Sequence, residues 1–445
     1  TINSTGVYID NALVTLVDLV GDNGVVHVID AVLLPPSPSN SIYDIVSNYV
    51  ELKKRGRNFF GLCPVHNEKT ASFSVNPDRQ IYKCFGCGIG GSSIDFIMEV
   101  EKLDFIEAIR YLAEQYSIEL EISGSNSNSI DVRSELYDMN KHTLNLYQKN
   151  LFDTKNKDHL NYFIERGITS ELINEFGLGL SFNKWNILWK SFQGKKLQTK
   201  SMLECGLFSD TKNGYIDRFR NRIMFTIYDS TGRPIAFAGR AIDKDENAKY
   251  LNSPETQIYN KSKTLYGLHQ TKNEIASKDH AIIVEGYFDF LQIYKSGIKN
   301  VVAVSGTSLT DGHANILKRL TKNVKIAYDG DNAGISAAIR AGFVLLKNGL
   351  NPSIVQIPIG KDPDDWILES GNQEFMNAVD SSLPLIQFSY NQFEKKHDTD
   401  IASFINEINI ALSDIDDSVI TEINLKELSV ITGISIESIQ QNFES

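Results

Sequence analysis

The chain has 445 residues, 42% of them hydrophobic, which is enough for about three packed domains. No apolar run approaches the ~20 residues of a membrane-spanning helix, and no signal peptide is visible at the start, so a membrane or secreted protein is not expected. The net charge of −12 argues at first against nucleic-acid binding, but residues 362–445 alone hold 17 acidic and 3 basic side chains. The rest of the chain is therefore slightly basic, and local patches rather than the total charge meet phosphates.

Residues 1–38 are expected to be a small strand-rich fragment followed by a linker. Apolar and polar residues alternate over Val7–Asp10 and Val25–Asp30, and Asp22–Gly24 is typical of a hairpin turn between strands. Pro and Ser dominate Leu34–Ser39, as in a linker. The fragment resembles the last strands of a fasciclin domain, but a segment this short cannot bury a core alone, and we assign no function to it.

Two pairs of candidate metal ligands follow within residues 41–121. Cys63 and His66 are separated by two residues, as are Cys84 and Cys87, with 17 residues between the pairs. Two such turns offer four ligands to one tetrahedral ion, and three thiolates with one imidazole form a closed, structural Zn²⁺ site without an open catalytic position. The alternative is a cluster of reduced core cysteines, which the paired spacing disfavours.

Basic and aromatic residues surround these ligands, a combination that suits single-stranded nucleic acid. The alternative is a solvated charged face over a small aromatic core. The residues are Lys53, Lys54, Arg55, Arg57, Lys69, Arg79 and Lys83, with Phe59, Phe60, Phe73, Tyr82 and Phe85. The stretches 49–59, 62–70 and 82–88 together resemble the zinc-binding domain of bacterial DNA primases. The resemblance implies a zinc-ribbon module that helps to select the initiation site on the template.

Residues 131–275 are predicted to be helical to about residue 180 and mixed α and β after it. Arginine occupies every second position at the end of the run Asp217–Arg222, a pattern that places these side chains on one face of a strand. The region resembles the α+β primase-specific subdomain of the same family, which carries a basic template-binding ridge. The resemblance implies that six basic residues contact template and nucleotide phosphates, whereas the alternative is ordinary surface charge. These residues are Arg166, Arg220, Arg222, Arg240, Lys249 and Lys261.

Residues 278–365 alternate short apolar strands with helical stretches, which predicts a parallel α/β sheet. Acidic residues follow three of the apolar segments: Glu285 and Asp289, then Asp329 and Asp331, then Asp362, Asp364 and Asp365. Ligand sites in open parallel sheets form at the carboxyl ends of the strands, so these acids are expected to meet, with Gly330 turning Asp331 to the same side as Asp329. Carboxylates this close repel one another unless divalent cations bind them. A single D-x-D pair is more often a solvated turn.

This arrangement resembles the catalytic domain shared by topoisomerases and primases (Toprim). The resemblance implies that Glu285 is the catalytic acid or base, or positions the metal. It implies a catalytic Mg²⁺ or Mn²⁺ site formed by Glu285, Asp289, Asp329, Asp331, Asp362 and Asp364. Asp365 has no role by motif, and residues 366–445 are expected to form a short helical C-terminal segment.

The sequence thus predicts a multidomain α/β protein with a zinc ribbon, an α+β primase subdomain and a Toprim domain. The resemblance covers about nine tenths of the chain, from Ser41 onward. It implies a cytoplasmic DNA primase that makes short RNA primers from ribonucleoside triphosphates on single-stranded DNA at the replication fork. A replicative helicase is an implied partner, although its binding domain is expected to be missing or truncated, because the chain stops at Ser445.

Two other classes of function stay open at this point. One is a nuclease or topoisomerase on the same catalytic fold, although a topoisomerase needs a strand-cleaving tyrosine in an added domain, and none is evident. The other is a non-catalytic, zinc-dependent DNA-binding protein, against which the intact set of acids argues.

Overall fold

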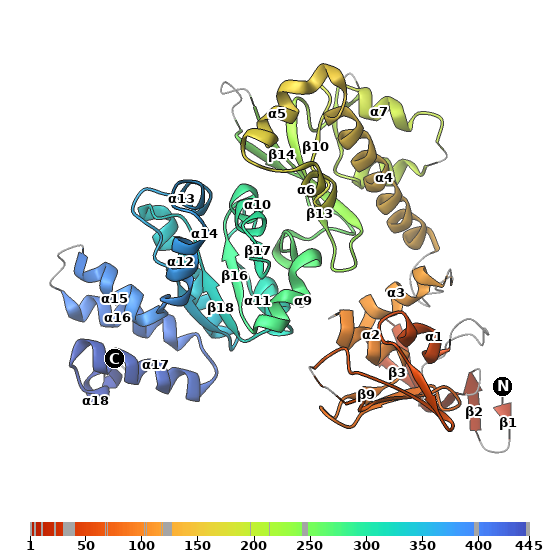
Figure 1. The fold of residues 1–445 in the computed structure, drawn as a ribbon, viewed down its shortest axis with the longest axis horizontal. Coiled ribbons are helices and arrows are strands. Elements are labelled where there is room, and N and C mark those ends of the chain that lie inside the picture. Colours follow the sequence, from red (N-terminus) through yellow and green to blue (C-terminus); the bar gives the residue numbers. More distant parts are fainter. Residues whose placement is uncertain are drawn as a thin grey trace. The chain divides into compact units, whose positions relative to one another are not determined.

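The computed structural model of the chain consists of two compact units, Thr1–Ser129 and Ile130–Ser445 (Figure 1). It describes only the backbone of residues 2–3, 6–9, 12–21 and 24–29, and likewise at 106–107, 114, 127–131 and 441. It further describes residues 41–66, 68, 70–101, 103, 105–116, 118, 127–195, 197–212, 214–242, 248–395 and 400–441. None of the described helices is both long and apolar enough to span a bilayer.

Four antiparallel strands begin the first unit: β1 (Ile2–Asn3), β2 (Gly6–Ile9), β3 (Ala12–Gly21) and β4 (Gly24–Ile29). Gly21 pairs with Gly24, so the predicted hairpin between the last two strands is confirmed. The likeness to a fasciclin domain stays a prediction, and the predicted linker at 34–39 lies outside the described residues.

The rest of the first unit is a zinc-ribbon-like sheet with helices. The antiparallel strands β5 (Lys53–Arg55), β6 (Asn58–Gly61), β7 (Phe73–Asn76), β8 (Ile81–Cys84) and β9 (Gly90–Gly91) follow in chain order. The helices are α1 (Ile42–Ser47), α2 (Ser93–Glu101) and α3 (Phe105–Gln115). The rings of Phe73, Tyr82 and Phe96 pack together in its core, with Phe73 and Tyr82 stacked 5.3 Å apart.

The second unit begins with an antiparallel sheet in the order β10 (Gly179–Leu180), β13 (Arg222–Tyr228), β14 (Pro234–Ala241) and β15 (Tyr250–Asn252). Strand β13 is buried on both faces because alternate side chains point to opposite sides. Ile223 and Phe225 belong to one core cluster, which also contains Tyr287, whereas Met224 packs in another cluster with residues of the long helix α4 (Ser127–Leu151).

Shorter elements complete this part of the chain. The helices are α5 (Lys157–Glu165), α6 (Ser170–Glu175), α7 (Ile187–Phe192) and α8 (Thr199–Glu204), with the 3-10 turns η1 (Thr154–Asn156) and η2 (Lys261–Lys263). The strands β11 (Phe208–Thr211) and β12 (Gly214–Asp217) form a separate two-stranded ribbon.

A second sheet follows in the order β17 (Val301–Ala303), β16 (Ala281–Val284), β18 (Asn323–Ile326), β19 (Asn351–Ile354) and β20 (Leu383–Pro384). The first four strands are parallel and β20 is antiparallel, so the predicted parallel α/β sheet is confirmed. Because β17 and β18 lie on opposite sides of β16, the chain changes direction there, and sites in such sheets form at this switch point.

Helices cover both faces of this sheet (Figure 1). One core cluster contains Ile282 and Val284 with residues of α10 (Tyr287–Lys295), α13 (Pro363–Ser370) and α14 (Asn372–Asp380). The other contains Ala281 and Ile283 with residues of α9 (Leu268–Lys278), α11 (Asp311–Lys318) and α12 (Asn332–Lys347). The predicted helical tail is confirmed as α15 (Leu385–Lys395), α16 (Ile401–Ser413), α17 (Ser418–Thr432) and α18 (Ile436–Gln441).

Candidate metal and nucleotide sites

The first unit brings the four predicted zinc ligands together. One possible ligand atom from each of Cys63, His66, Cys84 and Cys87 lies within 4.8 Å of all the others. The sulfur atoms of Cys63 and Cys87 are 3.9 Å apart, as are the sulfur of Cys84 and Nδ1 of His66. Ligand atoms around a tetrahedral Zn²⁺ with bonds of about 2.3 Å lie about 3.8 Å apart. These residues therefore fit one structural zinc ion, and they are the one group this compact among the described residues.

The thiols of Cys63 and Cys84 differ in how strongly they hold their protons. Burial is the main cause that raises the pKa of Cys63 to about 12. Burial also acts to raise the pKa of Cys84, but hydrogen bonds from Ser72 and from backbone amides outweigh it and lower that pKa to about 7. Zinc binding stabilises all the thiolates together.

Glu68 holds this site from outside, a role that the sequence analysis missed. Its carboxylate accepts hydrogen bonds from the backbone N–H of Cys63 at 2.8 Å and of Ser72 at 3.2 Å, and from the Ser72 hydroxyl. It also lies 3.3 Å from Nε2 of His66, which leaves Nδ1 to face the thiols. A carboxylate behind a metal-binding histidine fixes its tautomer and orientation. The available signal was an acidic residue two positions after the histidine.

The aromatic residues around the zinc ligands divide between the two predicted roles. Phe73 and Tyr82 are buried and form the core, as the alternative reading expected, whereas Phe85 is 71% exposed. All three residues of β5 are exposed, and Lys54 and Arg55 lie over the rings of Phe59 and Phe60, at 5.9 and 5.7 Å. Lys69 lies outside the described residues. Binding of single-stranded DNA by this surface stays a prediction.

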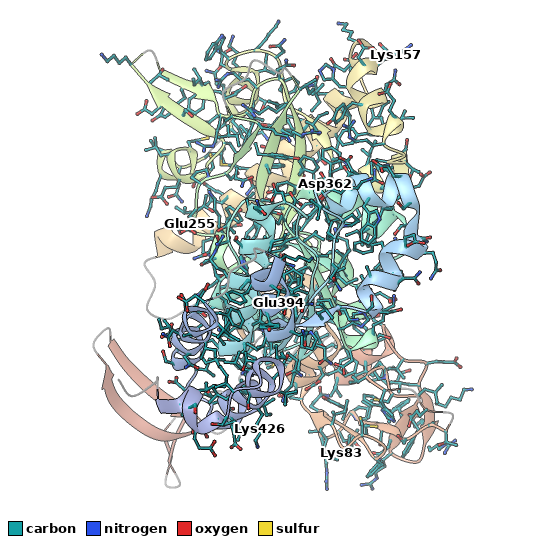
Figure 2. All side chains as sticks on the ribbon, turned by 90° about the vertical axis from the view of Figure 1, so that its left-hand side faces the viewer. Lys83, Lys157, Glu255, Asp362, Glu394 and Lys426 are labelled. Carbon is teal, nitrogen blue, oxygen red and sulfur yellow. The ribbon has the colours of Figure 1, made fainter. Side chains whose placement is uncertain are left out.

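The second unit contains a cavity of about 930 Å³ at the carboxyl ends of β16 and β18. Glu285 follows β16, Asp289 lies in the first turn of α10, and Asp329 follows β18. Asp362 is the N-cap of α13, and Asp364 lies in its first turn. In Figure 2, Asp362 lies between the yellow-green and the light-blue parts of this unit. The cavity is lined by Glu285, Asp289, Asp329, Asp362 and Asp364, together with Asp365.

Asp331 does not line this cavity. Its carboxylate accepts a 2.7 Å hydrogen bond from the backbone N–H of Gly334 and so caps α12. It lines a neighbouring hollow of about 710 Å³, which also borders Asp329. Asp331 therefore shares this second hollow with Asp329, and its place among the metal ligands stays a prediction. Gly330 has another function: a Cβ there would lie 2.2 Å from the carbonyl oxygen of Pro358, so only glycine allows this close approach of the segment that leads to Asp362.

Four carboxyl groups in the cavity, those of Glu285, Asp289, Asp329 and Asp364, have raised pKa values. Burial is the main cause in each case, and neighbouring carboxylates add to it. The pKa of Asp329 is raised to about 7 and that of Asp364 to about 6, while the pKa values of Glu285 and Asp289 are also raised. One buried oxygen of Glu285 and one of Asp364 have no hydrogen-bond partner among the described residues. Such a group of unsatisfied acids fits divalent cations with oxygen ligands.

Three of the six predicted basic residues, Arg166, Arg240 and Lys249, line the same cavity. The guanidinium of Arg166 lies 3.9 Å from the ring centre of Tyr162, and that of Arg240 lies 4.9 Å from that of Phe288. Nε and Nη1 of Arg240 are buried without a hydrogen-bond partner in the described part of the chain. Planar cations held on aromatic rings with free donors suit phosphate groups.

The other three basic residues do not line the cavity, and the predicted strand face of arginines is wrong. Strand β12 ends at Asp217 and β13 begins at Arg222, so Arg220 lies in a loop, 4.3 Å over the ring of Trp185. Arg222 is buried and donates to the carbonyls of Gly239 at 3.3 Å and Ala248 at 2.8 Å. It thus anchors the chain just before Lys249 rather than facing solvent.

Lys261 lies in η2, where its carbonyl oxygen is 2.8 Å from Nε2 of His313. Phosphate contacts of Arg220 and Lys261 stay predictions.

Residues without an assigned role also line the cavity. The side-chain amide of Asn252 donates to the carbonyl of Ser305 at 3.1 Å and accepts from the Tyr287 hydroxyl at 3.1 Å, so it joins β15 to the turn after β17. Gly306 in that turn has φ +81°, and a Cβ there would lie 2.9 Å from Asn252. Arg340 on α12 lines the cavity as well. No motif of the sequence pointed to Arg340.

Three family models match successive parts of the chain. The model described as "CHC2 zinc finger" matches residues 30–128. "DNA primase catalytic core, N-terminal domain" matches residues 146–272, and "Toprim-like" matches residues 282–367. The three matches follow one another along the chain in the same order as the four predicted zinc ligands, the predicted basic residues and the acids of the cavity.

Whole proteins and solved structures agree with these matches. The DNA primase of Clostridium acetobutylicum is 39% identical over 407 residues, which are 90% of this chain and 67% of that protein. The zinc-binding and RNA polymerase domains of the Aquifex aeolicus primase match with a TM-score of 0.62 and 34% identity, over 90% of this chain and 96% of that one. A primase catalytic domain solved with single-stranded DNA matches with a TM-score of 0.62 and 31% identity, over 69% of this chain and 99% of that one.

Proposed function

The chain belongs to the family of bacterial DNA primases, which are DNA-directed RNA polymerases, and we propose that the cavity of the second unit is its polymerising site. The protein is a nucleotidyltransferase that makes RNA primers on a DNA template. The observation that carries the proposal is the meeting of buried, proton-retaining carboxyls with Arg166, Arg240 and Lys249 in one cavity. Joining nucleotides needs both the acidic and the basic side chains, because carboxylates bind divalent metal ions and basic side chains bind phosphates.

The residues divide this chemistry between them. We infer that Asp289, Asp329, Asp362 and Asp364 hold Mg²⁺ or Mn²⁺, with Asp331 at their edge. A bound divalent cation neutralises triphosphate oxygens and makes the attacking hydroxyl more acidic. Glu285 has a buried oxygen without a partner in the described part of the chain, and we propose that it accepts the proton of that hydroxyl.

The basic residues would hold the phosphates. Arg240 offers the triphosphate its Nε and Nη1 atoms, which have no hydrogen-bond partner among the described residues. Arg166 and Lys249 extend the positive surface to the template strand, which agrees with the single-stranded DNA in the related solved structure.

The first unit would act before polymerisation. The matched zinc-finger model and the compact ligand group support structural zinc, and we propose Cys63, His66, Cys84 and Cys87 as its ligands. Zinc would hold the ribbon that presents β5 and Phe85, so that the module helps to select the initiation site. On the family resemblance we also propose a replicative helicase as a partner at the fork.

One experiment tests the proposed function against a nuclease or a topoisomerase. The full chain is incubated with single-stranded circular DNA, labelled ribonucleoside triphosphates and either Mg²⁺ or Mn²⁺. Short labelled RNA is expected, with the circle intact, and Asp329→Asn should abolish it. Cut circles without RNA would instead identify a nuclease. Relaxation of a supercoiled plasmid in a parallel reaction would identify a topoisomerase.

A further inference from the structure

The cavity of the second unit has two chemically different ends. One end lies at the starts of α10 and α13, where Asp289, Asp362 and Asp364 meet the basic residues of the antiparallel sheet. The other end lies between α12 and the turn after β17. Its walls are mainly apolar and are formed by Val304, Leu309, Ala337, Ala341 and Val344, with Thr307 and Ser308 of the turn beside them.

Glu285 lies between these ends because it follows β16, which runs between the two helical layers. The polar end borders α10 and α13, which pack on one face of the sheet, whereas Val304, Leu309 and Ala341 belong to the core on the other face. Phosphates and cations have no reason to occupy an apolar recess. Ligand cavities of about 300–1,000 Å³ hold drug-sized molecules, so a volume of about 930 Å³ leaves room beyond one triphosphate.

Arg340 adds a charge to the apolar end. Arg340, Ala341 and Val344 follow Ala337 by three, four and seven residues, so all four side chains share one face of α12. Arg340 is exposed, and no hydrogen bond or ion pair of its guanidinium is found among the described residues. Burial raises the pKa of Glu285, and the positive charge of Arg340 acts in the opposite direction. A planar cation beside an apolar wall is suited to the face of a nucleobase.

The start of a primer requires two nucleotides at once. The 3′-oxygen of the first attacks the α-phosphorus of the second, a new P–O bond forms, and the bond to the leaving pyrophosphate breaks. The proton of the 3′-hydroxyl passes to a base. The polar end fits the triphosphate of the second nucleotide, and Glu285 lies next to it.

On the basis of the proposed function, we propose that the apolar recess and Arg340 bind the base and sugar of the nucleotide that supplies the attacking 3′-hydroxyl. During initiation nothing but the protein and one template base holds this nucleotide. During extension its place is taken by the end of a primer that many base pairs hold to the template. The recess therefore matters most for the first bond.

The test compares these two reactions in the full chain with its zinc. De novo synthesis is measured on single-stranded circular DNA, and extension on a short RNA annealed beforehand, each over a range of ribonucleotide concentrations. The variants are Arg340→Ala and Ala337→Leu, which narrows the recess from a partly exposed position. Lys347→Ala is the matched control, because Lys347 is an exposed cation of the same helix that does not line the cavity.

Arg340→Ala should raise the KM for de novo synthesis by about tenfold, the cost of losing a partly desolvated cation–π contact. Ala337→Leu should also raise it, because the larger side chain fills the recess. Their KM for extension should change less than about twofold, Arg340→Lys should restore part of the loss, and Lys347→Ala should behave as wild type. Equal effects on initiation and extension, or no effect on either, would overturn the proposal. If wild-type protein makes no RNA in either reaction, the proposed function itself is wrong, and this inference falls with it.

Discussion

Asp329→Asn should abolish RNA synthesis and at the same time stabilise the metal-free protein at pH 8. The pKa of Asp329 is raised from its ordinary value of 3.8 to about 7, chiefly by burial and then by Glu285 and other neighbouring acids. A group with a raised pKa in the folded state binds its proton more strongly there. Its ionisation therefore weakens the fold progressively as pH rises from about 4 to about 7, and the full cost is present above that range.

The size of the effect follows from the shift. Each pKa unit corresponds to about 1.4 kcal/mol, so the shift of about three units sets an upper bound near 4 kcal/mol. Asp329 is only half-buried, and solvent screening reduces the interaction, so we expect about 1–2 kcal/mol. Asparagine carries no charge, so the variant should exceed wild type by that amount at pH 8 and match it near pH 4.

Tryptophan fluorescence during urea unfolding reports on the right part of the chain, because Trp185, Trp189 and Trp366 all lie in the second unit. Divalent cations are omitted rather than chelated, so that zinc stays in the first unit. Adding Mg²⁺ at pH 8 should then stabilise wild type and leave the variant nearly unchanged. A variant that is destabilised equally at both pH values would refute the reasoning, since the charge of Asp329 would then not be what limits stability.

Four further substitutions test other parts of the structure. Cys84→Ser should release zinc and unfold the ribbon while the second unit still unfolds at its usual urea concentration; zinc content measures the first effect. Glu68→Gln should keep zinc but weaken its binding about 10- to 100-fold in a chelator competition. Lys249→Ala should lower the log–log salt slope of single-stranded DNA binding by about 0.7, with exposed Lys157→Ala as the unchanged control. Arg222→Ala should cost about 1–3 kcal/mol of unfolding free energy by leaving buried carbonyls unpaired; an unchanged stability with weaker DNA binding would contradict its anchoring role.

The sequence predicted well those features that depend on local spacing or on strand direction. The pairs at Cys63–His66 and Cys84–Cys87 are short turns, so their spacing alone brings each pair of ligands together. The acids meet because parallel strands end at the same edge of the sheet. Glu285 and Asp329 each follow an apolar strand in the sequence, so their positions were enough to predict that they meet.

The sequence misplaced Arg220 and Arg222 because the alternating arginines were taken to lie on one strand, whereas the chain leaves strand β12 at Asp217 and enters β13 only at Arg222. Asn221 has φ +49°, a left-handed conformation that turns the chain just before β13. Asparagine adopts this conformation more readily than most residues, so the sequence held a weak sign of the break. That Arg222 is buried against Ala248 depends on the fold of a segment 26 residues later, which no local pattern encodes.

The acids of the cavity, together with Asp331 in the neighbouring hollow, fall into two groups, which suggests how the site binds and releases cations. Asp289, Asp331 and Asp362 each accept a backbone N–H at the start of a helix, at 3.0, 2.7 and 2.7 Å. Those bonds and the positive helix ends orient these three side chains without any cation. Glu285, Asp329 and Asp364 cap none of the described helices, and raised pKa values show that their charge is poorly compensated. The first group therefore fixes the geometry, whereas the second supplies negative charge that a proton or a cation must neutralise. Asp289 does both, because its pKa is raised as well, chiefly by burial. Because protons and cations compete for that second group, cation binding should strengthen as pH rises through about 6 to 7, while the helix starts stay in place.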